Sequence, residues 1–276
     1  MYKCLSVLFG CLLVLGQSIL GNDVFANPKA TAELDEASPL TIAVASNFAY
    51  TLEQLIARSP FWSAQELRIV TGSSGVLYAQ ILKGAPFDVF LSADFERPNK
   101  LVQAGLGYHA QVYAIGRLTL WMGGIIDVSE HNEISTETSY LSYLTNFSGK
   151  LAIADPRVAP FGKAALELIE NEPALRYLQA QLVKGSNVNQ AFQFVDSSNA
   201  QAGLIAESLL IQARAVLGSV KYQNYILIPR TQHTLIEQAV ISLKRENMHS
   251  QSDAFVRFIL SPETQAVLTE YGYDMP

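Results

Sequence analysis

The chain has 276 residues, a formal net charge of -6 and 49% hydrophobic residues. This composition is sufficient to bury a full core and excludes a disordered or collagen-like polymer. A net acidic chain is also a poor candidate for binding nucleic acid or an anionic membrane, so no nucleic-acid partner is expected and any bound anion must be held by local dipoles.

The first residues have the pattern of a secretory signal. Lys3 precedes an apolar run over residues 4–20, and Val24-Phe25-Ala26 forms a small-residue type of cleavage site, which predicts cleavage after Ala26, with residues 1–26 as the signal peptide. One alternative is an uncleaved membrane anchor, for which a run of roughly 17 residues lies at the lower limit. The other is a lipid on Cys11, but the lipoprotein box would then lie inside the apolar run. We therefore expect a periplasmic protein.

Both cysteines, Cys4 and Cys11, lie in this leader. The mature chain is thus predicted to lack disulfides, thiolate metal sites and a cysteine nucleophile.

Residues 27–39 show no periodicity and predict a flexible spacer. The fold is expected to begin at Leu40, with a buried strand over 40–45 and a helix after it. The unit then repeats as a strand over 67–71, a helix ending at Gly84, a strand over 88–91 and a helix ending near Gly105. Alternating strands and helices predict an α/β class with right-handed crossovers.

Residues 113–122 form a long apolar run that predicts one strand, and the pattern then starts again. Further strands are expected over 151–154, 201–206 and 239–243, and helical segments over 161–170, 176–182, 254–260 and from Pro262 onward. We predict two similar lobes with mixed, mainly parallel sheets around a ligand cleft. Residues 40–113 and 231–276 would form lobe 1, and residues 114–230 lobe 2.

Four short turns follow predicted strands and precede predicted helices, at residues 45–48, 72–75, 155–162 and 185–191. The start of a helix exposes backbone N–H groups and the positive end of its dipole, which can hold an anion without a cation. Each turn alone has a simpler interpretation, as an N-cap at Ser46 or Asn187, a Gly-Ser linker, or a helix initiated by Pro160. Their equivalent placement favours one shared anion at the carboxyl ends of the strands.

Motifs of catalysis are not found. The turn over 72–75 lacks the spacing of a nucleophile elbow, and residues 162–164 lack the rest of a phosphate-binding loop. The four histidines lie outside the turns, so neither a metal cluster nor a catalytic triad is predicted: His109, His131, His233 and His249. We expect no enzyme and no cofactor; an exported hydrolase with Ser74 or Ser46 as nucleophile is the alternative from another class.

Aspartates near the predicted strand ends need a separate explanation, because a carboxylate in contact with an anion repels it. Asp88, Asp94 and Asp155 are therefore interpreted as turn and capping groups.

Residues 84–94, Gly-Ala-Pro-Phe-Asp-Val-Phe-Leu-Ser-Ala-Asp, closely resemble the G-A-P-x-D-[VL]-F-x-S-A-D stretch of molybdate/tungstate-binding periplasmic proteins. These proteins are solute receptors of ABC importers with the type II periplasmic binding protein fold. The resemblance extends to residues 45–48, 72–80, 113–118, 156–162 and 187–191, and thus over essentially the whole chain from residue 40.

The resemblance implies a two-lobed receptor, expected to be a monomer, that closes on dehydrated molybdate or tungstate and delivers it to the membrane permease of an ABC importer. The metal would be present only within the oxyanion. The implied contacts are the hydroxyl and N–H groups of Ser46 and Ser74 and the backbone N–H groups of Asn47, Phe161 and Val188. Ser73 and Asn187 are expected to support them from behind.

One position departs from the family. Some members place a tyrosine hydroxyl on the anion where this chain has Ala206. A receptor of the same architecture for sulfate, phosphate or an organic acid is the alternative within this class.

Overall fold

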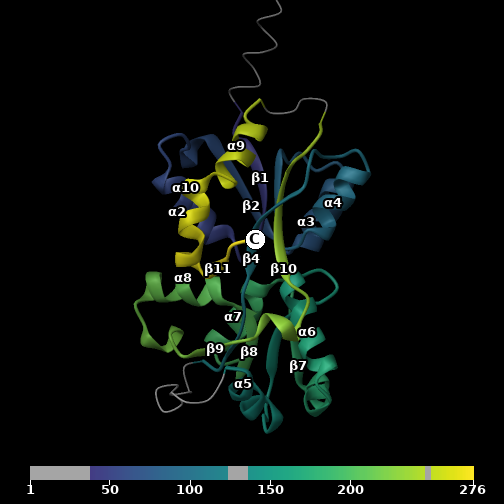
Figure 1. Cartoon of the computed structure of the whole chain (residues 1–276), viewed down its shortest axis with the longest axis vertical. Helices are drawn as coiled ribbons and strands as arrows, with labels where there is room; N and C mark the ends of the chain where they lie inside the picture. The colour runs from purple at the N-terminus through teal and green to yellow at the C-terminus, as the bar shows by residue number, and fades with distance from the viewer. Residues whose placement is uncertain (1–37, 124–135, 246–249) are drawn as a thin grey trace, which may run out of the picture.

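The computed structural model describes residues 38–123, 136–245 and 250–276, so the predicted signal peptide and most of the predicted spacer lie outside the described residues. The described chain forms two α/β lobes stacked along the long axis of the molecule, and its C-terminus lies between them (Figure 1). None of the helices within these ranges combines the length and the apolar character needed to cross a membrane.

Lobe 1 is built on a six-stranded sheet with the order β11-β4-β10-β3-β1-β2. Strands β1, β2 and β3 pair in parallel, whereas β10, β4 and β11 join antiparallel. The strands are β1 (Leu40–Ala45), β2 (Leu67–Gly72), β3 (Val89–Ser92), β4 (Gln111–Gly116), β10 (Ile236–Ser242) and β11 (Tyr273–Asp274).

Lobe 2 is built on a five-stranded sheet with the order β7-β6-β8-β5-β9. Here β6 pairs in parallel with β7 and β8, and β5 pairs antiparallel with β8 and β9. The strands are β5 (Leu118–Trp121), β6 (Leu151–Ala154), β7 (Leu182–Gly185), β8 (Ala202–Ala206) and β9 (Tyr225–Leu227).

Helices cover both sheets (Figure 1). Those of lobe 1 are α2 (Ala49–Arg58), α3 (Ser74–Leu82), α4 (Glu96–Gln103), α9 (Ser252–Ile259) and α10 (Pro262–Val267). Those of lobe 2 are α5 (Thr136–Thr145), α6 (Pro160–Asn171), α7 (Val188–Asp196) and α8 (Glu207–Leu217). Short 3-10 helices occupy Ala64–Glu66, Pro173–Gln181, Val220–Tyr222, Arg230–Gln232 and Leu268–Tyr271.

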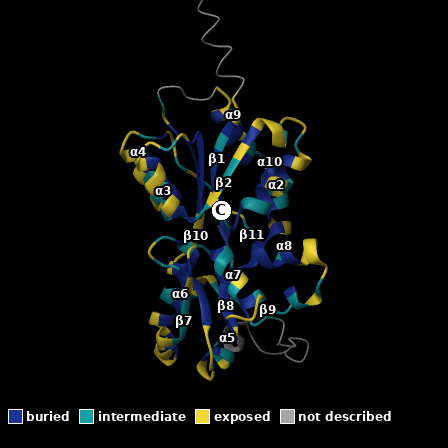
Figure 2. Cartoon of the chain, turned by 180° about the vertical axis from the view of Figure 1, so that it is seen from behind, coloured by how far each residue is buried: buried dark blue, intermediate teal, exposed yellow. Residues whose placement is uncertain are grey.

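The central strands of the lobe 1 sheet are buried on both faces. Along β1, Ile42 and Val44 pack into one apolar cluster, and Ala43 between them packs into the cluster on the other face. Figure 2 shows the central strands of the sheets as buried and much of α3 and α4 as exposed. Strands buried on both faces read as continuous apolar runs, which explains why β1 and β6 have the bounds expected from the sequence.

The mixed α/β architecture agrees with the prediction, but the run over 113–122 is not one strand. It divides at Arg117 into β4 of lobe 1 and β5 of lobe 2. Because β4 continues to Gly116, residues 114–116 belong to the lobe 1 sheet rather than to lobe 2. The segment expected to be helical over 176–182 is a 3-10 helix followed by β7, which the sequence analysis did not predict.

Arg117, where the chain passes between the lobes, is tied to both of them. Its guanidinium donates to Asp274 of β11 through Nε at 2.8 Å and to Glu207 of α8 through Nη1 at 2.9 Å. The hydrogen bond with Asp274 contributes most to raising the pKa of Arg117. The crossing is therefore held by a charged pair on each side.

Candidate anion-binding site

The four turns identified in the sequence meet at one small cavity between the lobes. Turns after β1 and β2 come from lobe 1, and turns after β6 and β7 from lobe 2. The cavity is lined by Ala45, Ser46, Asn47, Gly72, Ser73, Ser74, Ala93, Ala159, Pro160, Phe161, Asn187 and Val188. All seven residues expected to form or support the site are among them.

The cavity is small and partly open to solvent. Its volume is about 10 Å³, whereas one water molecule needs about 10–15 Å³. Ala45 and Ala93 of lobe 1 already pack into the apolar cluster of lobe 2, so the lobes are in contact around it. This space is too small for an organic molecule.

Ser46 differs from the expectation in two ways. Its N–H donates to the carbonyl of Gly72 at 3.0 Å, extending the pairing of β1 with β2, so this N–H is not left for an anion. Ser46 is also not the N-cap, because α2 begins at Ala49 after a turn in which the Phe48 N–H donates to the Ala45 carbonyl at 2.9 Å. The hydroxyl of Ser46 is the group that can still donate.

Asn47 offers its backbone N–H, which has no acceptor among the described residues. Its side chain donates to Gln238 Oε1 at 3.0 Å and to the Tyr273 hydroxyl at 3.3 Å. Its carbonyl accepts from Tyr273 at 2.8 Å and from Ser208 of lobe 2 at 3.1 Å. The residue is thus fixed on three sides.

Ser74 is the first residue of α3, and its N–H has no acceptor within the helix. Its hydroxyl accepts the Ala93 N–H at 2.9 Å, which leaves the hydroxyl proton for another acceptor. Ser73 precedes it as N-cap without a side-chain capping bond, and its buried hydroxyl has no hydrogen-bond partner in the described part of the chain. Two hydroxyl groups at this turn can therefore donate.

Phe161 is the second residue of α6, behind Pro160, in the proline-initiated start that the sequence predicts. The side chain is buried, and its N–H lies in the first turn, where no acceptor exists within the helix. The N–H of Phe161 is thus available at the start of a long helix.

Val188 is the first residue of α7 and is likewise buried. Asn187 before it is the N-cap: its side chain accepts the Gln190 N–H at 3.0 Å. The N–H of Val188 remains without an intrahelical acceptor, so Asn187 supports the turn as expected.

Among the described residues, no charged side chain lines the cavity. Asp94 and Asp155 behave as the sequence predicts, since Asp94 accepts the Arg97 N–H at 2.8 Å and Asp155 accepts the Arg157 N–H at 3.0 Å. The hydrogen bond from the Arg157 side chain lowers the pKa of Asp155. The carboxylates at these turns are therefore occupied.

A buried polar network behind the site was not predicted. Tyr113 donates to Gln238 Oε1 at 3.0 Å, and Gln238 in turn holds Asn47. Burial raises the pKa of Tyr113 well above its ordinary value and that of Tyr273 to about 12, so both remain neutral donors. Gln238 within the apolar strand β10 was the available signal in the sequence.

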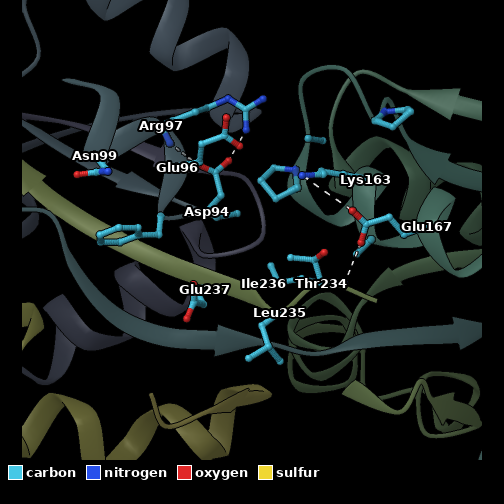
Figure 3. Close-up of a pocket in the computed structure, with 16 residues that line it drawn as sticks. Asp94, Glu96, Arg97, Asn99, Lys163, Glu167, Thr234, Leu235, Ile236 and Glu237 are labelled. Carbon is cyan, nitrogen blue, oxygen red and sulfur yellow. Dashed lines mark hydrogen bonds and ion pairs between the residues drawn. The ribbon is translucent and has the colours of Figure 1, made fainter. Parts of the chain in front are cut away.

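A second, larger cavity of about 390 Å³ lies beside the first and shares Ala93, Ala159 and Pro160 with it. Figure 3 shows Asp94, Glu96 and Arg97 of lobe 1 facing Lys163 and Glu167 of α6 across this space. It is lined by four carboxylates and two cations: Asp94, Glu96, Glu167, Glu237, Arg97 and Lys163. The excess of negative charge disfavours it as an anion site.

Neither histidine of the described ranges, His109 or His233, lines the small cavity, and His131 and His249 lie outside those ranges. Within these ranges no group of three or more histidine, cysteine, aspartate or glutamate side chains could hold a metal ion. Ala206, where some relatives carry a tyrosine, is buried at the end of β8 and does not line the cavity.

Comparison with known proteins finds similarity to solute-binding proteins, including molybdate-binding ones. The chain is 30% identical over 240 residues to the molybdate-binding protein ModA of Rhodobacter capsulatus, covering 86% of this chain and 88% of the relative. The solved periplasmic molybdate-binding protein of Azotobacter vinelandii superposes with a TM-score of 0.73 at 30% identity, covering 86% of this chain and 99% of that one. The sulfate-binding protein SubI of Mycobacterium tuberculosis shares the fold at 12% identity, with a TM-score of 0.64 over 86% of this chain and 87% of that one.

The model of the bacterial extracellular solute-binding protein family matches residues 40–274. This match covers both lobes and all four turns, and it agrees with the prediction of a receptor rather than an enzyme. The chain belongs to the bacterial extracellular solute-binding protein family.

Proposed function

We propose that this protein is an exported receptor that binds molybdate or tungstate in the small cavity and delivers it to the permease of an ABC importer. The observation that carries the proposal is a small cavity between the lobes that no charged side chain of the described residues lines, surrounded by hydroxyl and N–H groups that have no other acceptor within those ranges. Relatives named as molybdate-binding proteins support this choice of anion.

The proposed donors are the hydroxyl groups of Ser46 and Ser74 and the N–H groups of Asn47, Ser74, Phe161 and Val188. A hydrogen bond to a charged group contributes about 1.5–3 kcal/mol, so about six of them can offset much of the cost of dehydrating a dianion. The starts of α3, α6 and α7 add the positive ends of their dipoles. The unpartnered hydroxyl of Ser73 is a further candidate in place of the tyrosine missing at Ala206.

Selectivity follows from size under this proposal. Molybdate, tungstate and sulfate share charge and tetrahedral shape, so a neutral donor shell can distinguish them only by the separation of its donors. Backbone N–H groups at helix starts are fixed by the helices and cannot contract readily around a smaller anion. A rigid shell sized for the larger anions leaves sulfate with long hydrogen bonds.

The proposal is tested by isothermal titration of the purified, ligand-free protein with molybdate, tungstate, sulfate and phosphate. Molybdate and tungstate should bind at micromolar concentration or below, with sulfate and phosphate weaker by at least about tenfold, or about 1.4 kcal/mol. Tighter binding of sulfate or phosphate would reassign the receptor to another oxyanion. No binding of any of the four would reject the anion site itself.

Export and the monomeric state belong to the same proposal. A receptor of this family captures its solute outside the cytoplasmic membrane. We therefore infer a leader cleaved after Ala26 and a soluble monomer in the periplasm. Mass spectrometry of the protein recovered from the periplasm would give both the cleavage point and the absence of a lipid on Cys11.

A further inference from the structure

The start of α3 makes contacts in two directions. Ser74 lines the cavity, with an N–H that has no acceptor in the helix and a hydroxyl proton still to donate, whereas Gly75, the next residue, donates its N–H to the carbonyl of Val158 at 2.8 Å. Val158 belongs to the turn of lobe 2 that leads into α6. A single dipeptide thus joins a proposed anion donor to a hydrogen bond between the lobes.

The same contact is sterically tight. A Cβ atom at position 75 would lie 2.8 Å from the Cα of Val158 and 2.9 Å from its carbonyl oxygen. Both are backbone atoms, so a change of rotamer cannot relieve the collision. Gly75 is not among the glycines with positive φ, and therefore the need for glycine comes from the approach of the opposite lobe.

The turn of lobe 2 that contains Val158 is held by its own hydrogen bonds. The N–H groups of Val158 and Ala159 both donate to the carbonyl of Asp155, at 3.1 and 2.9 Å, and the Asp155 side chain is bound by Arg157. Phe161, the first proposed donor of lobe 2, lies three residues after Val158. A displacement at Val158 would therefore be carried to the Phe161 N–H.

We propose that the contact between Gly75 and Val158 is the stop that sets how closely the two halves of the donor shell approach, and with it the size of anion that fits. The inference rests on the proposed function, because it assigns the Ser74 and Phe161 groups to one anion. Gly75 acts here as a positioning residue and does not itself touch the anion.

The test compares Gly75→Ala with Val76→Ala, its partly exposed neighbour on the same helix turn, in titrations with molybdate and tungstate and in small-angle scattering with and without ligand. Gly75→Ala should weaken binding of both anions by about tenfold or more, because the added methyl group overpacks the contact, and should reduce the compaction on binding. Its ligand-free melting temperature should be unchanged or higher, because alanine favours a helix over glycine. Val76→Ala should bind as the wild type.

A second comparison separates backbone from side chain. Val158→Ala alone should bind nearly normally, and it should not rescue Gly75→Ala, because the closest atoms are backbone. Wild-type affinity and compaction in Gly75→Ala, or rescue of that variant by Val158→Ala, would contradict the proposal that the contact between Gly75 and Val158 limits the approach of the lobes. Failure of the wild type to bind any oxyanion would instead overturn the proposed function.

Discussion

At the scale of single residues, the proposed donors divide into those that act through a side chain and those that act through the backbone. Ser74 is anchored by the Ala93 N–H on its hydroxyl oxygen, which directs the hydroxyl proton elsewhere. Phe161 and Val188 contribute only a peptide N–H, so their side chains serve packing. Substitutions at the two kinds of position should therefore differ in their effect on binding.

Ser74→Ala should weaken molybdate binding by about 1–3 kcal/mol, because an oxygen of the buried anion loses its hydrogen bond. Phe161→Leu should change the affinity little, since its N–H is retained and a large apolar side chain still fills the space. Titration calorimetry on both variants checks the assignment. A large loss in Phe161→Leu together with none in Ser74→Ala would reverse it.

At the scale of elements, the site depends on how closely the helices approach the ends of the strands. The start of α6 lies against the end of β6: a Cβ atom on Gly162 would come within 2.2 Å of the Ala154 carbonyl oxygen. Only glycine allows this approach, and the approach brings Phe161 at the start of α6 to the lining of the cavity.

Gly162→Ala should therefore displace the start of α6 and destabilise the ligand-free protein by about 1–3 kcal/mol. Calorimetric melting would show a lower transition temperature, and molybdate affinity should fall because the Phe161 N–H moves. Lys163→Ala, an exposed change on the next residue, is the control and should stay within about 0.5 kcal/mol of the wild type. Equal melting temperatures for Gly162→Ala and the wild type would contradict this account.

Most strands and helices, and the positions of their ends, could be predicted from the sequence. Strands buried on both faces, such as Leu40–Ala45 and Leu151–Ala154, are continuous apolar runs with distinct ends, and helices start where small and capping residues follow them. The division at Arg117 could not be predicted, because two adjacent apolar strands in different sheets have the same pattern as one long strand. The hydrogen bond from the Ser46 N–H to the Gly72 carbonyl could not be predicted either, because it depends on the register of β1 against β2, which a single sequence does not specify.

At the scale of the whole molecule, a hydrogen bond joins the two lobes next to the site. The carbonyl of Asn47 accepts from Tyr273 near the C-terminus and from Ser208 of lobe 2, so chain segments far apart in sequence meet behind one proposed donor. The bond from Ser208 joins lobe 2 to the turn that carries the Asn47 N–H. The bond from Tyr273 lies within lobe 1, and it makes the structure behind this turn depend on a tyrosine that remains protonated.

That dependence predicts a loss of stability in alkali. Burial raises the pKa of Tyr273 from the ordinary value of 10.0 to about 12, and burial also raises that of Tyr113. Because the unfolded chain loses these protons at lower pH than the folded one, the stabilisation is complete below about pH 10 and is lost as the pH rises toward 12. For Tyr273 a difference of about two pKa units corresponds to about 2–3 kcal/mol.

Urea denaturation at a series of pH values between 8 and 11 measures this loss, with Tyr273→Phe as the comparison. The variant should be less stable at pH 8, because the Asn47 carbonyl loses a donor, but its stability should fall less steeply above pH 10, because one buried ionisable group is gone. Parallel curves for the variant and the wild type would show that Tyr273 ionises alike in both states. A shallower curve for the variant would instead place the alkaline limit of the protein at the hydroxyl that joins β11 to the anion-binding turn.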